Sequence, residues 1–150
     1  MLRVVLVEPE IPQNTGNIAR LCAAVETPLH VVGVTGFRMD DRAVRRAGLD
    51  YWDAVTLHRH RDLNDLYQSL RQVRFLYFST KAERGFWDWH FEGDDCLVFG
   101  PETRGLPAPL LKDNWERCLK IPIFNPKVRS LNLANSVAIA LYEAIRQTSR

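Results

Sequence analysis

The chain has 150 residues, 46% of them hydrophobic, and a formal net charge of +2 at pH 7. This length and hydrophobic content suit a single globular domain, residues 1–150, with its own core. The charge excludes a strongly basic, dedicated nucleic-acid-binding domain but is compatible with an RNA or DNA partner. No apolar run is as long as a membrane span, and the first strand pattern begins at Val4, without room for a signal peptide. With three widely spaced cysteines expected as buried free thiols, these features predict a cytoplasmic protein.

Short apolar runs alternate along the chain with segments of helical spacing. The runs predicted as strands are residues 4–7, 29–34, 54–57, 75–78, 96–99 and 119–121. Helices are predicted after the loop at residues 8–14, at 40–47, from 62 onward, at 107–113 and after 130. Asp40 and Asp62 are the predicted N-caps, and Gly48 is placed to end the second helix. This alternation implies an α/β fold, a mostly parallel sheet with helices on both faces.

The last predicted helix has two apolar rows. It is expected to begin after Ser130, whose hydroxyl can accept from the free N–H groups of a first helical turn. Its buried stripe is predicted from helical spacing as Ala134, Val137, Ala138, Leu141 and Ile145. A second row, centred on Ile139 and Tyr142, is too apolar for a fully solvated face. We therefore expect this helix either to be central in its domain or to be shared with a partner chain.

Three polar loops rich in glycine or proline follow the predicted strands. They are residues 14–20 (N-T-G-N-I-A-R), residues 99–107 (F-G-P-E-T-R-G-L-P) and residues 121–132 (I-P-I-F-N-P-K-V-R-S-L-N). Ligand sites in parallel α/β sheets lie outside the carboxyl ends of the strands, so these loops are the candidate functional segments. Each one alone is also compatible with ordinary turn chemistry.

The second loop does not match the known phosphate-binding motifs. Gly100 and Gly105 have the spacing of a P-loop, but Leu106 and Pro107 stand where lysine and serine or threonine are required. The G-x-G-x-x-G fingerprint of dinucleotide-binding folds is absent from the sequence as well. A small-molecule nucleotide-binding protein is therefore disfavoured.

Two other clusters have a structural and a functional interpretation. His58 and His60 lack a cysteine or carboxylate at ligand spacing, which favours a solvated strand end and predicts no metal. Four aromatic residues in the segment 85–91 could stack on bases. For them a packed edge or a subunit contact is the favoured interpretation. These aromatic residues are Phe86, Trp87, Trp89 and Phe91.

Taken in order, the three loops resemble the three motifs of the SPOUT superfamily of RNA methyltransferases, in its SpoU/TrmH branch. The resemblance covers essentially the whole chain. The opening L-V-E-P-E-I-P-Q-N-T-G-N-I-A-R-L-C, with no added RNA-binding domain, is similar to the small TrmL/YibK type. That resemblance implies S-adenosylmethionine-dependent 2′-O-methylation of the wobble nucleotide, number 34, a cytidine or cmnm5-uridine, in leucine tRNAs. It also implies a homodimer, formed here through the C-terminal helix, and a deep trefoil knot, which periodicity alone would not predict.

The resemblance also assigns roles to individual residues. The catalytic set is Arg20, Asn14, Glu102, Ser130 and Asn132. The cofactor-binding set is Phe78, Gly100, Ile121, Ile123, Ser130 and Leu131. Gly100 is expected to let the backbone approach the cofactor, where a side chain would obstruct it. Because a guanidinium stays protonated, Arg20 is expected to clamp a substrate phosphate and stabilise the developing 2′-oxyanion rather than act as a free base.

Two alternative functions remain open on the same fold. One is methylation of another tRNA or rRNA nucleotide, since no single residue of the chain specifies a wobble base. The other is a non-catalytic RNA-binding dimer. Such a dimer would be expected to have lost Arg20 or to have a disrupted Gly100 loop, and both are intact here.

Overall fold

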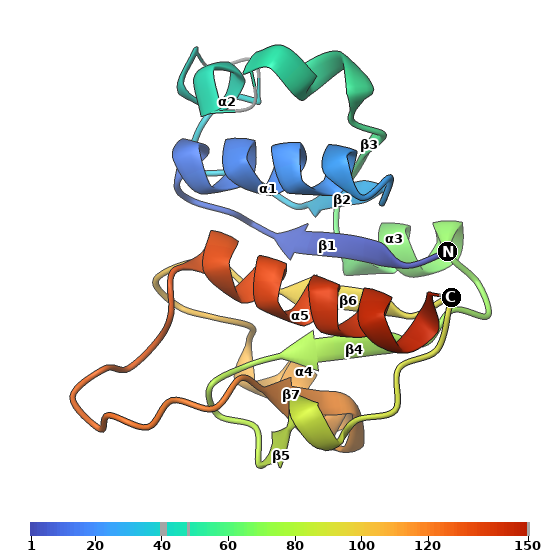
Figure 1. Ribbon diagram of the computed structural model, residues 1–150, viewed down its shortest axis with the longest axis vertical. Coiled ribbons are helices and arrows are strands. Elements are labelled where there is room, and N and C mark those ends of the chain that lie inside the picture. Colours follow the sequence, from blue (N-terminus) through green and yellow to red (C-terminus); the bar gives the residue numbers. More distant parts are fainter. Residues whose placement is uncertain (40–41, 48, 150) are drawn as a thin grey trace.

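The computed structural model describes residues 1–39, 42–47 and 49–149. Over these residues the strands form one seven-stranded parallel sheet in the order β3-β2-β1-β6-β4-β7-β5. The strands are β1 Arg3–Val7, β2 Leu29–Val32, β3 Leu57–His60, β4 Phe75–Phe78, β5 Arg84–Gly85, β6 Cys96–Phe99 and β7 Cys118–Lys120. The α-helices are α1 Pro12–Ala24, α2 Arg42–Ala47, α3 Leu63–Ser69, α4 Ala108–Asp113 and α5 Leu133–Thr148. The predicted α/β fold with a parallel sheet is confirmed (Figure 1).

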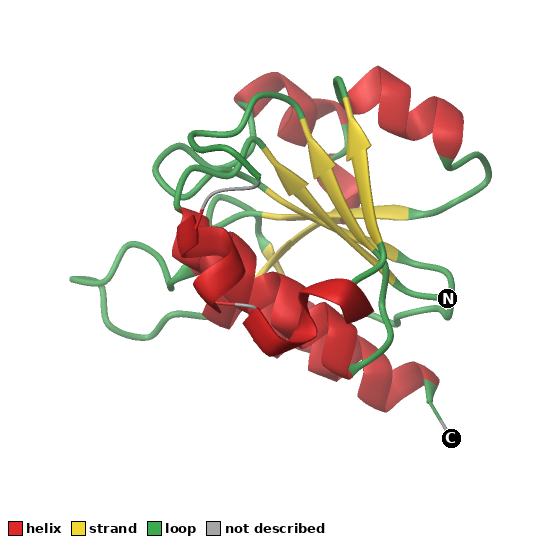
Figure 2. Cartoon of the chain, turned by 90° about the horizontal axis from the view of Figure 1, so that it is seen from above, coloured by secondary structure: helices red, strands yellow, loops and turns green. Residues whose placement is uncertain are grey.

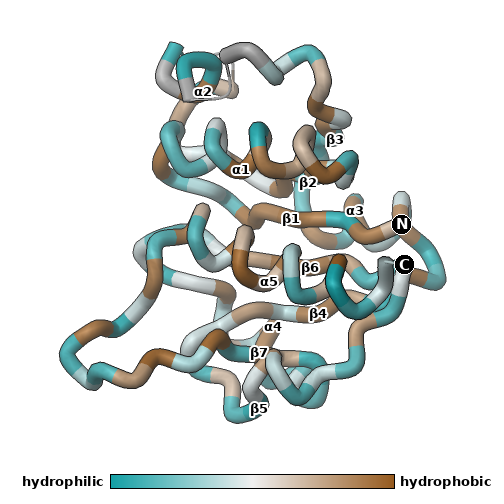
Figure 3. Tube along the Cα trace, in the orientation of Figure 1, coloured by the Kyte–Doolittle hydropathy of each residue, from teal (hydrophilic) through white to brown (hydrophobic). Residues whose placement is uncertain are grey.

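Helices cover both faces of the sheet (Figure 2). On one face α1 and α5 contact each other and bury residues such as Ile18 and Val137 against Leu6 of β1. On the other face, Leu66 of α3 and Leu111 of α4 belong to a second core. Strands β2, β4 and β6 are therefore buried along their whole length, which explains their continuous apolar sequences. Hydrophobic residues dominate the middle of the sheet accordingly (Figure 3). None of the helices in the described part of the chain is long and apolar enough to cross a membrane.

Most predicted element boundaries agree with the structure to within two residues. Asp62 caps α3 as predicted, with its carboxylate accepting from the Asp65 N–H at 2.8 Å. The strand predicted at 54–57 is wrong, because residues Leu49–Ala54 form a 3₁₀ helix and β3 begins only at Leu57. As an edge strand, β3 pairs with β2 alone and tolerates exposed polar residues, which the apolar pattern could not anticipate. The predicted cap Asp40 and stop Gly48 lie outside the described residues.

Helix α5 begins three residues later than the predicted cap. Asn132 is its N-cap, with Oδ1 accepting from the Asn135 N–H at 3.2 Å, so the prediction that Ser130 caps the helix is wrong. The predicted stripe is right only in its centre, at Val137 and Leu141. Ala134, Ala138 and Ile145 are half-buried instead, and the stripe is completed by Leu133, Ala140 and Ala144. Helical spacing could not fix this rotation, because the neighbouring rows of α5 are both apolar.

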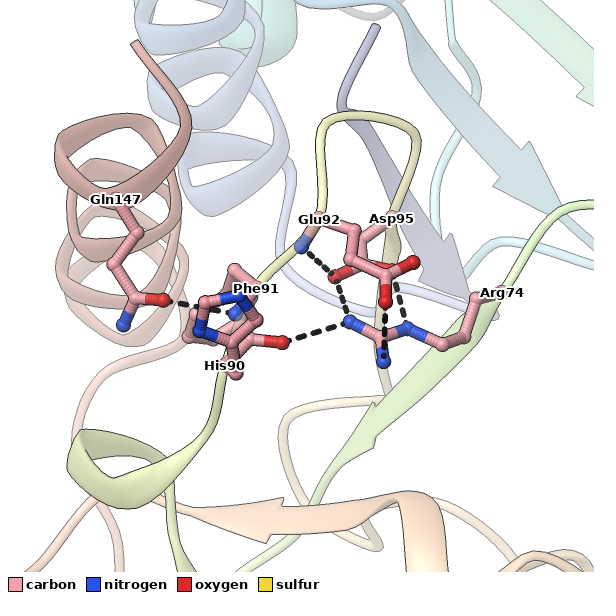
Figure 4. Close-up of polar contacts among 6 residues, drawn as sticks. All are labelled: Arg74, His90, Phe91, Glu92, Asp95 and Gln147. Carbon is pink, nitrogen blue, oxygen red and sulfur yellow. Dashed lines mark hydrogen bonds and ion pairs between the residues drawn. The ribbon is translucent and has the colours of Figure 1, made fainter.

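An ion pair at the start of β4 anchors the segment that leads into β6 (Figure 4). Asp95 is only 1% exposed and accepts from Nε and Nη2 of Arg74 at 2.6 and 2.7 Å. Arg74 also donates to the carbonyl of His90 at 2.9 Å. Gln147 of α5 accepts from the Phe91 N–H at 2.8 Å. The connection between β5 and β6 is thus tied to both the sheet and the C-terminal helix, and the buried carboxylate is satisfied by a bidentate partner.

Candidate active site

A pocket of about 730 Å³ lies at the carboxyl ends of β4, β6 and β7. Its volume falls in the range typical of small-molecule sites. Nine of the ten predicted site residues line it: Asn14, Phe78, Gly100, Glu102, Ile121, Ile123, Ser130, Leu131 and Asn132. The fold therefore brings the three candidate segments together around one cavity, although they are far apart in the sequence. The prediction of a loop at residues 14–20 is wrong, because these residues lie within α1, which begins already at Pro12.

Glu102 joins the second loop to the start of α1. Its carboxylate accepts from the backbone N–H groups of Glu10 and Ile11, at 2.7 and 2.8 Å, and from Nδ2 of Asn14 at 3.2 Å. Ile11 precedes α1 and has no side chain that could cap the helix. The Glu102 carboxylate supplies this function from another segment, at the helix end where the dipole favours an anion.

Asn14, in the first turn of α1, joins this helix to the third loop. Its amide donates to Glu102, and its Oδ1 accepts from Nδ2 of Asn132 at 3.0 Å. Asn132 in turn uses its own Oδ1 to cap α5. Asn14 is only 6% exposed, so both ends of its amide are committed in a nearly buried position. The position of each loop therefore depends on the other two.

A second carboxylate reinforces the contact between the second loop and the segment that precedes α1. Glu10 accepts from the backbone N–H and the hydroxyl of Thr103, both at 2.8 Å. These hydrogen bonds lower the pKa of the Glu10 carboxyl, because they stabilise its ionised form. Glu10 and Glu102 thus bind each other's segments reciprocally.

Gly100 is required by the loop itself. A Cβ built on Gly100 would lie 2.4 Å from the Leu106 nitrogen and 2.5 Å from the Gly105 carbonyl carbon. Gly105 has φ +67° and donates to the carbonyl of Pro101 at 2.9 Å, which folds the loop back onto Gly100. The structure thus gives a reason for glycine at this position that differs from the predicted close approach to a cofactor.

Apolar and cationic side chains complete the pocket. Phe78 stacks on Phe99, with ring centroids 4.8 Å apart and an interplanar angle of 14°. Lys81 and Arg129 also line the cavity. The sequence analysis missed Lys81 together with Ser79 and Thr80. These three residues directly follow β4, and applying the strand-end rule to that strand as well would have found them.

Arg20 is the predicted site residue that lies elsewhere. It does not belong to the pocket lining, and it is exposed on α1 with its guanidinium 4.9 Å from the centre of the Tyr51 ring. The histidine pair predicted as a solvated strand end lies within β3 itself. His60 bonds to His30 of β2, with 2.8 Å between Nε2 and Nδ1. Among the described residues, no group of three His, Cys, Asp or Glu side chains could hold a metal ion.

The sequence and the fold match known proteins over nearly the whole chain. The family model of the SpoU rRNA methylases matches residues 1–142. The tRNA (cytidine(34)-2'-O)-methyltransferase of Escherichia coli K12 is 44% identical over 148 residues, which cover 98% of this chain and 94% of that protein. The chain belongs to the SpoU rRNA methylase family, and the protein is accordingly a methyltransferase.

Solved structures agree with this assignment. One, presented as "Structural insights into the 2-OH methylation of C/U34 on tRNA", is 45% identical with a TM-score of 0.90 and covers 98% of this chain and 95% of its own. The AdoMet-bound rRNA methyltransferase of Sinorhizobium meliloti is 24% identical with a TM-score of 0.85. It covers 97% of this chain and 56% of its own, and it shows the shared fold alone.

Proposed function

We propose that the protein uses S-adenosylmethionine to methylate the ribose 2′-hydroxyl of wobble nucleotide 34, a cytidine or cmnm5-uridine, in leucine tRNAs. The observation that carries this proposal is the hydrogen-bonded series Glu102–Asn14–Asn132, which holds the three loops around one pocket. The E. coli relative is named for the same reaction at cytidine 34. The solved structure concerned with C/U34 supports a pyrimidine nucleotide at that position. In this proposal the protein works in the cytoplasm.

The pocket suits S-adenosylmethionine, which supplies an activated methyl group when bound. Phe78, Ile121 and Ile123 form an apolar part of the lining that fits an adenine ring. The start of α5 also lines the pocket, and the free N–H groups and positive dipole of a helix start suit a carboxylate. Ser130 and Leu131, which precede α5 in the chain, line the pocket as well. The lining thus matches a molecule with one apolar end and one charged end.

Positioning supplies much of the rate in this proposal. Methyl transfer needs in-line approach of the 2′-oxygen, and a fixed geometry removes much of the entropic cost of that approach. Glu102 and Asn14 hold the pocket wall through bonds that are already satisfied, so they act as positioning residues. Asn132 is a positioning residue as well, because its amide is bonded to Asn14 and to the Asn135 N–H. Ser130 is exposed where the third loop meets the pocket and would contact the incoming ribose.

Arg20 requires a second copy of the chain in this proposal. It lies outside the pocket of its own protomer, on α1, which packs beside α5 (Figure 1). On α5 the second apolar row stays exposed, with Ile139 at 41% and Tyr142 at 54%. A homodimer formed through α5 would cover this row and bring α1 of one protomer toward the pocket of its partner. Arg20 would there clamp a phosphate and stabilise the developing oxyanion.

We also propose that the C-terminal segment is knotted. Strand β7 inserts between β4 and β5, which follow each other directly in the chain. Gln147 near the end of α5 is hydrogen-bonded to Phe91 and Trp89 in the connection from β5 to β6. The last strand therefore lies between two earlier strands, and the last helix is bonded to an earlier connection. Both features support threading of α5 through the connection from β5 to β6.

Incorporation of a tritiated methyl group from S-adenosylmethionine into a leucine tRNA tests the proposed function. Labelling is expected at nucleotide 34, and it should disappear when that nucleotide carries 2′-deoxyribose. Undiminished labelling of the deoxy substrate would reject the 2′-hydroxyl as the acceptor. Mass mapping of tRNA and rRNA, from cells lacking the protein and from cells with it restored, identifies the nucleotide independently. RNA binding without labelling of any RNA would instead identify a non-catalytic RNA-binding dimer.

A further inference from the structure

Two large aromatic side chains are exposed side by side next to the pocket. Phe124 is 84% exposed and Trp87 is 59% exposed. Their ring centroids lie 6.3 Å apart with an interplanar angle of 31°. Adjacent exposed rings form a contiguous apolar patch, and contiguous apolar patches are candidate contact sites.

The sheet brings the two rings together from different parts of the chain. Strand β5 pairs with β7, with Gly85 opposite Lys120, so that the segments following the two strands emerge next to each other. Trp87 follows β5 and rests against Phe86, which is only 2% exposed, with ring centroids 5.9 Å apart. Trp87 is therefore attached to a turn that the core anchors. Phe124 follows β7, on the long loop that extends away from the sheet in Figure 1.

The exposed loop connects this aromatic pair to the pocket and adds positive charge. Ile123, which precedes Phe124, lines the pocket, and so does Arg129 farther along the same loop. Residues 121–132 contain Lys127 and Arg129 and no acidic residue. The loop therefore presents aromatic and cationic side chains next to the cavity, which is the combination that binds single-stranded nucleic acid.

We propose that Trp87 and Phe124 form a stacking platform for an unpaired base of the substrate RNA, next to the nucleotide that enters the pocket. This inference rests on the proposed function and deepens it, because it assigns the surface that holds the RNA strand. Every base has a π-face, so the platform binds unpaired loop nucleotides without reading their sequence and discriminates against paired ones, whose faces are covered. The favoured interpretation of Trp87 from sequence was a packed edge or a subunit contact. Its 59% exposure argues against a packed edge, and its place beside Phe124 and the pocket loop favours base stacking over a subunit contact.

Fluorescence anisotropy with a labelled anticodon stem-loop RNA measures the platform directly. Phe124→Ala and Trp87→Ala should each weaken binding roughly tenfold, the scale of one lost stacking contact. Phe124→Trp should retain affinity, whereas Phe124→Leu, which is apolar but not aromatic, should weaken it as alanine does. Trp115→Ala is the control, because Trp115 is also exposed, at 40%, but belongs to the 3₁₀ helix before β7 and not to the segments that follow β5 and β7. Unchanged affinity in both alanine variants would overturn the proposal.

Kinetics and sedimentation separate this inference from its alternatives. In the methylation assay, KM for the RNA should rise in the two alanine variants while kcat and the affinity for S-adenosylmethionine stay unchanged. If the wild type binds the stem-loop but methylates no RNA, the proposed function is wrong. The binding data for the two alanine variants still test whether Trp87 and Phe124 stack on a base. If the doubly substituted protein sediments as a monomer where the wild type is a dimer, the rings are a contact between copies and the proposal is wrong.

Discussion

The side chains of Asn132 and Asn14, 118 positions apart in the chain, share a hydrogen bond of 3.0 Å. The same Asn132 side chain caps α5, so one residue fixes the start of the last helix and its position against the first. Asn14 passes this constraint on to Glu102. The stability of α5 and the geometry of the pocket are therefore coupled through a single amide.

Substitutions at Asn132 should separate its two contributions. Asn132→Ala should lower the free energy of unfolding by about 1 kcal/mol, the usual cost of a lost N-cap, and should also weaken cofactor binding. Asn132→Asp keeps an oxygen that can cap the helix but has no amide to donate to Asn14. The Asn132→Asp protein should retain most of the stability, but its affinity for the cofactor should still be lower. Denaturant unfolding and calorimetric titration measure the two effects, and equal cofactor affinity in all three proteins would argue against the coupling.

Replacing Gly100 should open the second loop. In Gly100→Ala the new Cβ meets the Gly105–Leu106 backbone, which cannot yield as a flexible side chain would, and Gly100→Val adds further bulk. We expect the affinity for S-adenosylmethionine, measured by calorimetry, to fall at least roughly tenfold, about 1.4 kcal/mol. Gly93→Ala is the control, since its Cβ would meet no atom within 4 Å. Normal cofactor binding by a folded Gly100→Val protein would mean that the pocket has been assigned wrongly.

Arg20 should be needed for methyl transfer but not for folding or for binding of the cofactor. Arg20→Ala removes an exposed side chain outside the pocket, so stability and cofactor affinity should stay close to wild type. Methyl transfer should fall roughly a hundredfold or more, the scale for one lost transition-state donor. Arg20→Lys should recover only part of it, because lysine lacks the forked geometry. Mixing Arg20→Ala with Gly100→Ala subunits should restore activity that neither has alone, if each pocket uses the partner's Arg20. Full activity of Arg20→Ala would exclude the catalytic role.

The exposed row of α5 should control assembly. Ile139→Asp places a charge where the proposed dimer would exclude water, at a cost of several kcal/mol to association. Ile139 is 41% exposed in the single chain, so the fold itself should tolerate the change. Sedimentation should show a folded monomer, whereas Val34→Asp, at a residue 81% exposed on the loop after β2, should leave the dimer intact. A dimer of normal stability with aspartate at 139 would rule out α5 as the contact.

Stability should decline in mild acid because of His30. Burial, with the nearby His58, His60 and Arg3, lowers the pKa of His30 to about 4. The unfolded chain then binds more protons than the folded chain between the ordinary pKa near 6.5 and 4, so stability is complete above about pH 6.5 and is lost as the pH falls. The loss is on the order of 3 kcal/mol at most. His30→Gln should flatten this pH dependence in denaturant unfolding, and exposed His90→Gln should not.

The sheet, the helix layers and the loops of the site follow from sequence because their signals are local. Apolar runs mark β4 and β6 to the residue, and Asp62 marks the start of α3. Where two nearby residues are equally suitable for the same structural role, tertiary contacts determine which of them takes it. Ser130 and Asn132 are both good caps, and only the hydrogen bond to Asn14 selects Asn132. The placement of Arg20 outside its own pocket, and the contact between Trp87 and Phe124, depend on distant segments and leave no trace in local spacing.

The three buried cysteines can be used to measure local unfolding of the chain. Cys22, Cys96 and Cys118 are at most 1% exposed, and burial raises the pKa of the Cys22 and Cys96 thiols to about 12. A thiol reagent therefore reacts with them only when α1, β6 or β7 separates from its neighbours, since the thiolate is the reactive form. The rate of modification at each cysteine measures how often that element opens. A cysteine introduced at position 124 would react without such opening, which allows selective labelling of the exposed loop against an unreactive background.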